Sequence, residues 1–232
     1  MQEISIGKIK KLDYSLNEAY KSLRTNLQFC GKDVKVIAFT SCIPNEGKSS
    51  VTLNVAQALV ASGNKVLLID ADMRKSVLVG RHRISKASNG LSHLLSGYRN
   101  IDEVLCKTNI DNLHMILAGP VPPNPSELIN SDRFKALIDN GRKIYDYILI
   151  DLPPLGSVTD AAIAATVCDG ICMVVSANTV SYKFAQKIKE QLDKTGCRIL
   201  GAVLNKVPVK QNGYYGKYYG KYYGSYYGKY GD

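Results

Sequence analysis

The stretch from Phe39 to Ser50 constrains the fold more than any other part of the chain. It follows an apolar run from Val34 to Phe39 that is typical of a buried strand, and it precedes a helical pattern from Ser49 to Ala61. A strand, a tight polar turn, Gly-Lys-Ser and a helix together form the layout of a phosphate-binding P-loop. The backbone N–H groups of such a turn and the helix dipole both favour a bound anion.

Within this stretch, Lys48 is expected to reach the β- and γ-phosphates of a nucleotide, and the Ser49 hydroxyl to bind Mg²⁺. Cys42 stands where the usual pattern has its first glycine, and Asn45 stands where a second turn glycine is expected. Asn is the non-glycine residue that best tolerates a positive φ. An ordinary strand–turn–helix corner with a capping serine is the alternative. The expected nucleotide-binding residues are Pro44, Asn45, Glu46, Gly47, Lys48, Ser49 and Ser50.

Composition narrows the class of protein. The chain of 232 residues fits one α/β domain with an appendage. Its six cysteines form no C-x-x-C pair, so we expect a reducing cytoplasm rather than a disulfide framework or a zinc site. The sequence contains neither a signal-peptide pattern nor an apolar run near the ~20 residues of a membrane span. The net charge of +10 is scattered and does not select a partner.

Two further apolar runs end in aspartate. The run from Lys65 leads into Asp70 and Asp72, and the run from Tyr145 to Leu152 contains Asp151 near its end. Ligands of open parallel sheets bind at the carboxyl ends of the strands. Paired carboxylates at that edge are costly unless a cation lies between them and the phosphates. We therefore expect Asp70, Asp72 and Asp151 beside Lys48.

The remaining patterns alternate between strands and helices, which predicts an α/β fold: a P-loop NTPase-like, mostly parallel sheet with helices on both faces. Residues 1–15 are predicted to be an extended lead-in, and a capping signal stands at Ser126. The three histidines have no ligand-like spacing and are predicted to be surface or packing residues. The further predicted strands are Leu113–Leu117, Gly170–Val175 and Ile199–Leu204, and the further helices are Leu16–Phe29, Arg133–Ile138, Thr159–Val167 and Tyr182–Lys194.

The first predicted helix carries a charged row opposite its apolar positions. Glu18, Lys21 and Arg24 follow one another at three-residue steps. Such a row is usually a solvated face with weak ion pairs. The alternative is a contact with another subunit, in which these charges pair with those of a neighbour.

The composition changes abruptly at Gly213, where a Tyr-Tyr-Gly pattern with a period of four begins. The segment has no aliphatic core, so residues 210–232 are predicted to be a flexible tail attached to a domain of residues 1–209. It could be an adhesive segment, a stacking surface for single-stranded nucleic acid, or a set of phosphate acceptors. The tail's net charge is +3 (4 Lys minus 1 Asp), and each phosphotyrosine adds a charge of about −1.5 to −2. These magnitudes favour the phosphate acceptors, because a few phosphates would reverse the charge of the tail. The acceptor tyrosines are Tyr214, Tyr215, Tyr218, Tyr219, Tyr222, Tyr223, Tyr226, Tyr227 and Tyr230.

Together these motifs resemble those of the bacterial tyrosine kinases (BY-kinases) that regulate capsule and exopolysaccharide synthesis, in their cytoplasmic single-domain form. The resemblance rests on Thr40 to Ser50, on Leu68 to Arg74 and on Ile148 to Pro154, which are similar to the Walker A, A′ and B motifs. Supporting pieces are Asn124 to Leu128, Gly201 to Val207 and the tyrosine cluster. Two departures are Asn45 for a usual glycine and Lys21 for the first arginine of the Glu-x-x-Arg-x-x-Arg oligomerisation motif.

The resemblance implies ATP- and Mg²⁺-dependent autophosphorylation of the tail, in trans within a ring-shaped homo-oligomer. It assigns Lys48 to phosphate neutralisation, Ser49, Asp72 and Asp151 to Mg²⁺, Asp70 to the base that takes the phenol proton, and Asn205 to the nucleotide site. It assigns helix 16–30, through Glu18, Lys21 and Arg24, to oligomerisation. The implied partners are a separate transmembrane activator of the polysaccharide co-polymerase type, which would recruit the protein to the inner face of the membrane, and a tyrosine phosphatase. No nucleic acid is expected.

Two other classes compete with this interpretation. Partition and site-selection ATPases share the P-loop but carry a signature lysine five residues before the catalytic lysine, where this chain has Ile43. They also have no reason for a tyrosine tail. A nucleic-acid-binding ATPase that uses the basic Tyr/Gly segment is the second competitor.

Overall fold

The computed structural model describes residues 1–7, 13–85 and 87–208. The predicted tail, and with it every acceptor tyrosine, lies outside the described residues. The strands are β1 Gln2–Glu3, β2 Val36–Ser41, β3 Val66–Asp70, β4 Leu105–Lys107, β5 Leu113–Ile116, β6 Tyr147–Asp151, β7 Gly170–Ser176 and β8 Ile199–Asn205. The helices are α1 Tyr14–Phe29, α2 Lys48–Val60, α3 Leu78–His82, α4 Leu91–Leu95, α5 Ile101–Val104, α6 Pro125–Ile129, α7 Asp132–Gly141, α8 Asp160–Ala165 and α9 Tyr182–Asp193.

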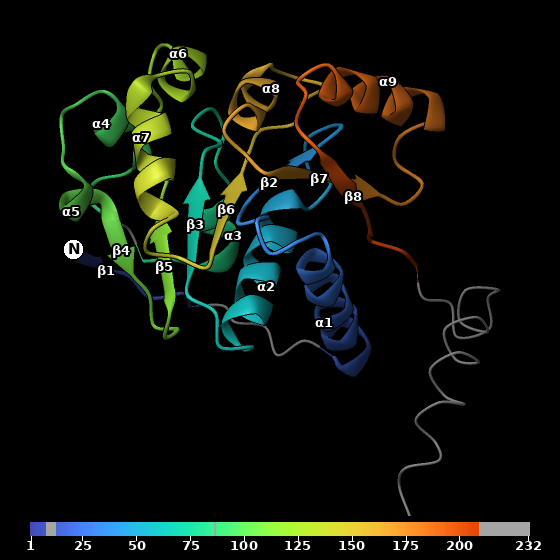
Figure 1. The fold of residues 1–232 in the computed structure, drawn as a ribbon, viewed down its shortest axis with the longest axis horizontal. Coiled ribbons are helices and arrows are strands. Elements are labelled where there is room, and N and C mark those ends of the chain that lie inside the picture. The colour runs from blue at the N-terminus through green and yellow to red at the C-terminus, as the bar shows by residue number, and fades with distance from the viewer. Residues whose placement is uncertain (8–12, 86, 209–232) are drawn as a thin grey trace, which may run out of the picture.

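The strands of the described chain form one eight-stranded sheet in the order β1-β4-β5-β3-β6-β2-β7-β8 (Figure 1). Every neighbouring pair is parallel except β4 and β5. The central strands β3, β6 and β2 are apolar and buried along most of their length, because helices cover both faces of a parallel sheet. The α/β, mostly parallel fold expected from the sequence is confirmed.

Helices cover the sheet as two layers, each with its own core. Alternate side chains of a strand point to opposite faces, so Ile37 and Phe39 face one layer while Val36 and Ala38 face the other. The first layer contains α1, α2 and α3, and the second contains α4, α6, α7, α8 and α9. In Figure 1, α1 and α2 lie below the sheet and α8 and α9 above it.

This topology brings the predicted motifs to one edge of the sheet. Strand β6 pairs with β3 on one side and with β2 on the other, and Asp70 lies directly opposite Asp151 in the β3–β6 register. The P-loop joins the carboxyl end of β2 to the first residue of α2, Lys48. Parallel strands therefore deliver the lysine and the aspartates to the same place.

Three expectations from the sequence need correction. The lead-in of residues 1–15 includes β1, which pairs with β4, and α1 begins at Tyr14 with Asp13 as its cap. Neither β1 nor β4 was predicted, because two or three residues are too few to show a period. Ser126 does not cap a helix: α6 is capped at Asn124, and the Ser126 hydroxyl donates to Asp160 instead.

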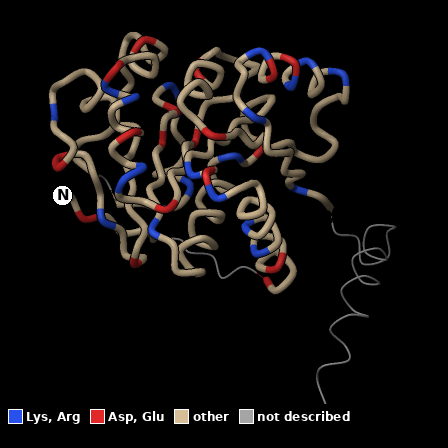
Figure 2. The backbone as a smooth tube through the Cα atoms, in the orientation of Figure 1, with Lys and Arg blue, Asp and Glu red and all other residues tan. Residues whose placement is uncertain are grey.

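Charge is distributed through the described chain without blocks of one sign, and Figure 2 shows basic and acidic positions interspersed along the backbone. All six cysteines are free. Each histidine has a packing role or a polar partner, as His114 does with the Tyr145 hydroxyl at 2.8 Å. Within the described residues, every helix is too short or too polar to cross a membrane.

Candidate nucleotide-binding site

The turn of the P-loop holds two residues at positive φ, Asn45 at 67° and Gly47 at 94°. The tolerance expected of Asn at its position is confirmed. Gly47 is also crowded, because a Cβ built there would lie 2.2 Å from Nδ2 of Asn205. A side chain at position 47 would therefore have to break the contact between the loop and β8 as well as adopt a strained backbone.

Glu46 organises the loop through its side chain. Its Oε2 accepts hydrogen bonds from the backbone N–H groups of Cys42, at 2.6 Å, and Ile43, at 2.9 Å, and its Oε1 accepts one from Ser176 at 3.0 Å. Glu46 as a whole is 1% exposed. Its carboxylate thus stabilises the turn from within, and Glu46 is not among the residues that line the hollow beside the P-loop.

The end of β8 closes the loop from the other side. Asn205 donates from Nδ2 to the Glu46 carbonyl at 2.8 Å, and Lys206 donates from Nζ to the Asn45 carbonyl at 2.6 Å. These bonds occupy carbonyl oxygens of the turn, so the N–H groups that Glu46 does not accept from can face an anion. Asn205 therefore contacts the P-loop, and its predicted role in nucleotide binding stays a prediction. Lys206 is a contact that the sequence did not reveal.

Lys48 lies between two carboxylates. Its Nζ is 3.0 Å from Oδ2 of Asp72 and 3.6 Å from Oδ1 of Asp151, and the Ser49 hydroxyl is 3.5 Å away. Burial alone would lower the pKa of Lys48, but the charges of Asp151 and Asp72 outweigh it and raise the pKa. The ammonium group therefore stays charged and is already held in place before any phosphate arrives.

The three aspartates form a buried acidic group behind this lysine. Burial, reinforced by the Asp151 charge, raises the pKa of Asp70 to about 7, against a hydrogen bond from the Ser76 hydroxyl that lowers it. Burial also raises the pKa of Asp151, although Lys48 and Ser49 partly offset the effect. The raised pKa values of Asp70 and Asp151 show that these two buried carboxylates are short of positive charge, which a divalent cation can supply.

The residues present fit Mg²⁺ only together with a nucleotide. Oδ1 of Asp151 is buried and has no hydrogen-bond partner within the described chain, so it can accept a cation or a metal-bound water. In that same part of the chain, no group of three or more His, Cys, Asp or Glu side chains is arranged to hold a metal by itself. Asp72, Asp151 and the Ser49 hydroxyl are the available ligands, and phosphate oxygens would have to complete the coordination shell.

A hollow of about 200 Å³ opens above these residues. Of the three aspartates, Asp72 alone is among its lining residues. The remaining wall of the hollow carries three basic residues that the sequence did not identify as part of the site, Arg74, Lys75 and Arg81. These three residues follow β3 in a segment with no strong period. Only the folded structure, in which this segment and the P-loop line the same hollow, identifies them.

Arg74 ties this wall to the second layer of helices. Its Nε and Nη2 donate to the two carboxylate oxygens of Asp160 at 2.8 and 3.0 Å, and Nη2 also donates to the Ser126 hydroxyl. Burial alone would raise the pKa of Asp160, but the hydrogen bonds from Arg74 and Ser126 outweigh it and lower the pKa. This bidentate pair fixes the loop after β3 relative to α6 and α8.

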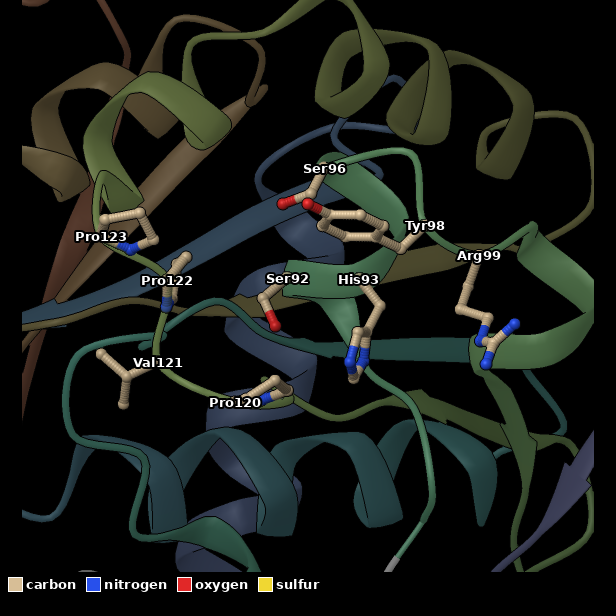
Figure 3. A pocket seen from close by; sticks show the side chains of 9 residues that line it. All are labelled: Ser92, His93, Ser96, Tyr98, Arg99, Pro120, Val121, Pro122 and Pro123. Carbon is tan, nitrogen blue, oxygen red and sulfur yellow. The ribbon is translucent and has the colours of Figure 1, made fainter.

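A second hollow of about 490 Å³ contains none of the predicted site residues (Figure 3). It lies between α4 and the proline-rich segment of residues 120–123, and Tyr98, His93 and Arg99 stand along it. Although it is larger than the P-loop hollow, it lacks a P-loop turn or a paired lysine, so the phosphate chemistry belongs to the smaller one.

The charged row of α1 is not uniform. Lys21 pairs with Glu18 at 2.7 Å, and both side chains are partly exposed. Arg24, in contrast, donates from Nη1 to the Ala58 carbonyl of α2 at 3.4 Å, and its Nε is buried without a partner in the described residues. The prediction of a solvated face is therefore wrong for Arg24, because α1 packs against α2 along that side.

Fold and site together define a P-loop nucleotide-binding protein. The AAA domain family matches residues 34–199. The tyrosine-protein kinase CpsD of Streptococcus agalactiae is 42% identical over 190 residues, which cover 82% of this chain and 83% of that protein. The crystal structure of the chimerical protein CapA2B2 is 32% identical with a TM-score of 0.81, covering 90% of this chain and 95% of that one. The chain therefore belongs to the BY-kinase family.

A site-selection ATPase, from the class that competes with the kinase interpretation, is less similar to this chain. The septum site-determining protein MinD of Pyrococcus horikoshii, in complex with Mg-ADP, is 26% identical with a TM-score of 0.63, and the match covers 76% of this chain and 72% of that one. The TM-score shows that the two chains share the fold. The chain is thus closer to the tyrosine kinases in sequence and in structure.

Proposed function

We propose that this protein is an ATP- and Mg²⁺-dependent tyrosine kinase that phosphorylates the tyrosines of its own C-terminal repeat. The observation that carries the proposal is the position of Lys48, held at the mouth of a P-loop within 3.0 Å of Asp72 and 3.6 Å of Asp151. Membership of the BY-kinase family supports it, because relatives there are named tyrosine-protein kinases. The repeated tyrosines of the tail supply the acceptors.

The chain's own residues would divide the work as follows. Lys48 and the N–H groups of the turn hold the phosphates, while Ser49, Asp72 and Asp151 hold Mg²⁺. When bound, Mg²⁺ neutralises charge on the phosphates and orients their oxygens. Since Glu46 and Asn205 already fix the turn, little reorganisation of the loop is required when nucleotide binds.

Phosphoryl transfer breaks the bond of ATP between the γ-phosphorus and the β,γ-bridging oxygen, which leaves with ADP, and forms a bond from the γ-phosphorus to the phenol oxygen. The phenol proton must go to a base, for which we propose Asp70. Asp72 is the competing candidate because it lines the hollow, whereas Asp70 is fully buried. Replacing the base by Asn should lower kcat about 10²- to 10⁴-fold while nucleotide still binds. Replacing a metal ligand should instead raise the Mg²⁺ concentration required.

We further propose that transfer occurs in trans within a ring-shaped homo-oligomer, in which α1 contributes Glu18, Lys21 and Arg24. The proposed regulation requires a separate transmembrane activator of the polysaccharide co-polymerase type and a tyrosine phosphatase, and its output is capsule or exopolysaccharide synthesis and export. Family membership supports these roles. A tail that changes from net positive to net negative supplies the physical means of altering subunit association.

Purified protein incubated with Mg-ATP, alone and with the cytoplasmic segment of its membrane activator, tests the proposal. Mass spectrometry should locate phosphotyrosine within residues 214–230. ATP hydrolysis without phosphotyrosine would instead support a partition-type ATPase. Salt-sensitive binding of RNA or DNA that is lost on deletion of the tail would support the nucleic-acid-binding alternative.

A further inference from the structure

Two cations in the P-loop hollow have no partner within the described chain. Lys48 is paired with Asp72 and Asp151, and Arg74 is paired with Asp160. Lys75 and Arg81 line the same hollow, but in the described residues neither side chain forms a hydrogen bond or an ion pair. Both are exposed to solvent, so they are available to an anion that enters from outside.

These cations come from a different segment than the phosphate-binding residues. The P-loop follows β2, whereas Lys75 and Arg81 lie after β3, on the loop to α3 and on α3 itself. The loop is anchored, because the backbone N–H of Lys75 donates to Oδ1 of Asp72 at 3.0 Å. The Lys75 side chain therefore begins three residues from a proposed Mg²⁺ ligand and is free at its charged end.

The same hollow also has an apolar wall. Val77, Val158, Pro153 and Pro154 line it together with the two cations. Flat aliphatic and proline surfaces suit the ring of an incoming tyrosine, and two cations that line the same hollow suit a phosphate attached to a neighbouring ring. The tail presents tyrosines in adjacent pairs, so an acceptor always has another tyrosine next to it or nearby.

We propose that Lys75 and Arg81 bind a phosphotyrosine already present on the acceptor segment, so that one phosphorylation favours the next. The inference rests on the kinase function proposed above and deepens it by naming the preferred substrate as a partly phosphorylated tyrosine repeat. A phosphotyrosine carries about −1.5 to −2 charges, whereas the unmodified repeat is basic and is repelled by these two residues. Priming therefore converts repulsion into attraction at the entrance of the site.

The test uses the full chain with its nine tail tyrosines replaced by phenylalanine, so that added peptide is the only tyrosine-repeat acceptor. Two synthetic peptides copy residues 213–220, one unmodified and one carrying a single phosphotyrosine. We expect kcat/KM to be about three- to tenfold higher for the primed peptide at low salt, and the ratio to fall at high salt because the charges are exposed.

The double variant Lys75→Gln, Arg81→Gln should bring the ratio of the two kcat/KM values close to one. Because both residues line the hollow, ADP affinity is measured alongside, and the ratio between peptides cancels any shared loss. Lys183→Gln, on α9 and outside the hollow, is the matched control and should keep the ratio of the parent. Equal rates on both peptides, or a preference that survives the double variant, would overturn the priming inference. Failure of the unsubstituted chain to label any tyrosine would overturn the kinase proposal itself.

Discussion

The charged residues at the carboxyl ends of β2, β3 and β6 are buried, whereas those along α1 are largely in contact with solvent. The Lys48 side chain is 9% exposed and lies between two carboxylates. The Lys21 side chain is 50% exposed and has a single partner on its own helix. Both lysines belong to motifs to which the sequence assigns a function, yet one is buried between carboxylates and the other is in contact with solvent.

Burial decides how much each charged side chain contributes to the stability of the folded chain. In the buried group every charge depends on another, so a change at one residue alters both stability and ligand binding. In the exposed row a pair contributes little until another surface covers it. Substitutions that remove one charge at a time test this contrast, and the largest effects are expected in the buried group.

Lys48→Met should have the largest effect. Phosphotyrosine labelling should fall by at least about 10²- to 10³-fold, since the phosphates lose their lysine. The free energy of unfolding should fall by about 3 kcal/mol at neutral pH, because Asp72 and Asp151 lose their buried partner. Mass spectrometry and urea unfolding measure the two effects. Lys21→Met is the stability control and should change unfolding by less than ~0.5 kcal/mol. A Lys48→Met protein that still labels itself would remove the P-loop from the mechanism.

Gly47→Ala should have the second-largest effect on stability and nucleotide binding. The backbone there has a φ of 94°, and the new Cβ would meet Nδ2 of Asn205. We expect a loss of about 1 to 3 kcal/mol in unfolding and weaker ADP binding. Gly80→Ala, with open space around its Cβ, should be neutral or slightly stabilising. Adding Asn205→Ala to Gly47→Ala should restore part of the stability, since the clash goes but the backbone strain stays. Full ADP affinity in Gly47→Ala would contradict the described loop geometry.

Asp160→Asn should lower the free energy of unfolding by an amount that depends on pH. The pKa of Asp160 is lowered in the folded state, so its stabilisation is present above the unfolded pKa of ~4 and is lost as the pH falls through the folded pKa. The variant should therefore be about 1.5 to 2 kcal/mol less stable than the parent at pH 7, and the difference should shrink below pH ~4. Urea unfolding at pH 7 and pH 3 measures it. Asp193→Asn, at an exposed pair with Lys189, should cost less than ~0.5 kcal/mol at either pH.

The sequence predicted the elements that have a clear period and the residues that lie within a motif. The P-loop strand and helix, and the strands that end in Asp70 and Asp151, are confirmed because long apolar runs and helical spacing are local signals. The carboxylates converge because β3 and β6 are parallel neighbours, which the strand-end rule anticipated.

The rest depends on contacts between distant positions. Arg74 meets Asp160 and Ser126 across 86 and 52 positions of sequence, so each looked like an ordinary surface residue or a helix cap. The internal role of the Glu46 side chain likewise depends on Ser176, 130 positions away. Spacing alone left two alternatives for Arg24, a solvated face or a subunit contact, because it cannot show that α2 covers that side of α1.

The smallest effect on stability is expected for the charged row of α1, which contains Glu18 and Lys21. Substitutions in this row also distinguish a solvated face from a subunit contact. Glu18→Gln removes the pair with Lys21 and should change the free energy of unfolding of the isolated chain by less than ~0.5 kcal/mol. If the row contacts another subunit, the same substitution should weaken self-association measured by analytical ultracentrifugation, and more so at low salt. Lys21→Arg should strengthen it, because a guanidinium can pair with a carboxylate through two bonds. Glu190→Gln, on the exposed side of α9, is the control. Unchanged association in both α1 variants would leave the row as a solvated face and move the subunit contact elsewhere.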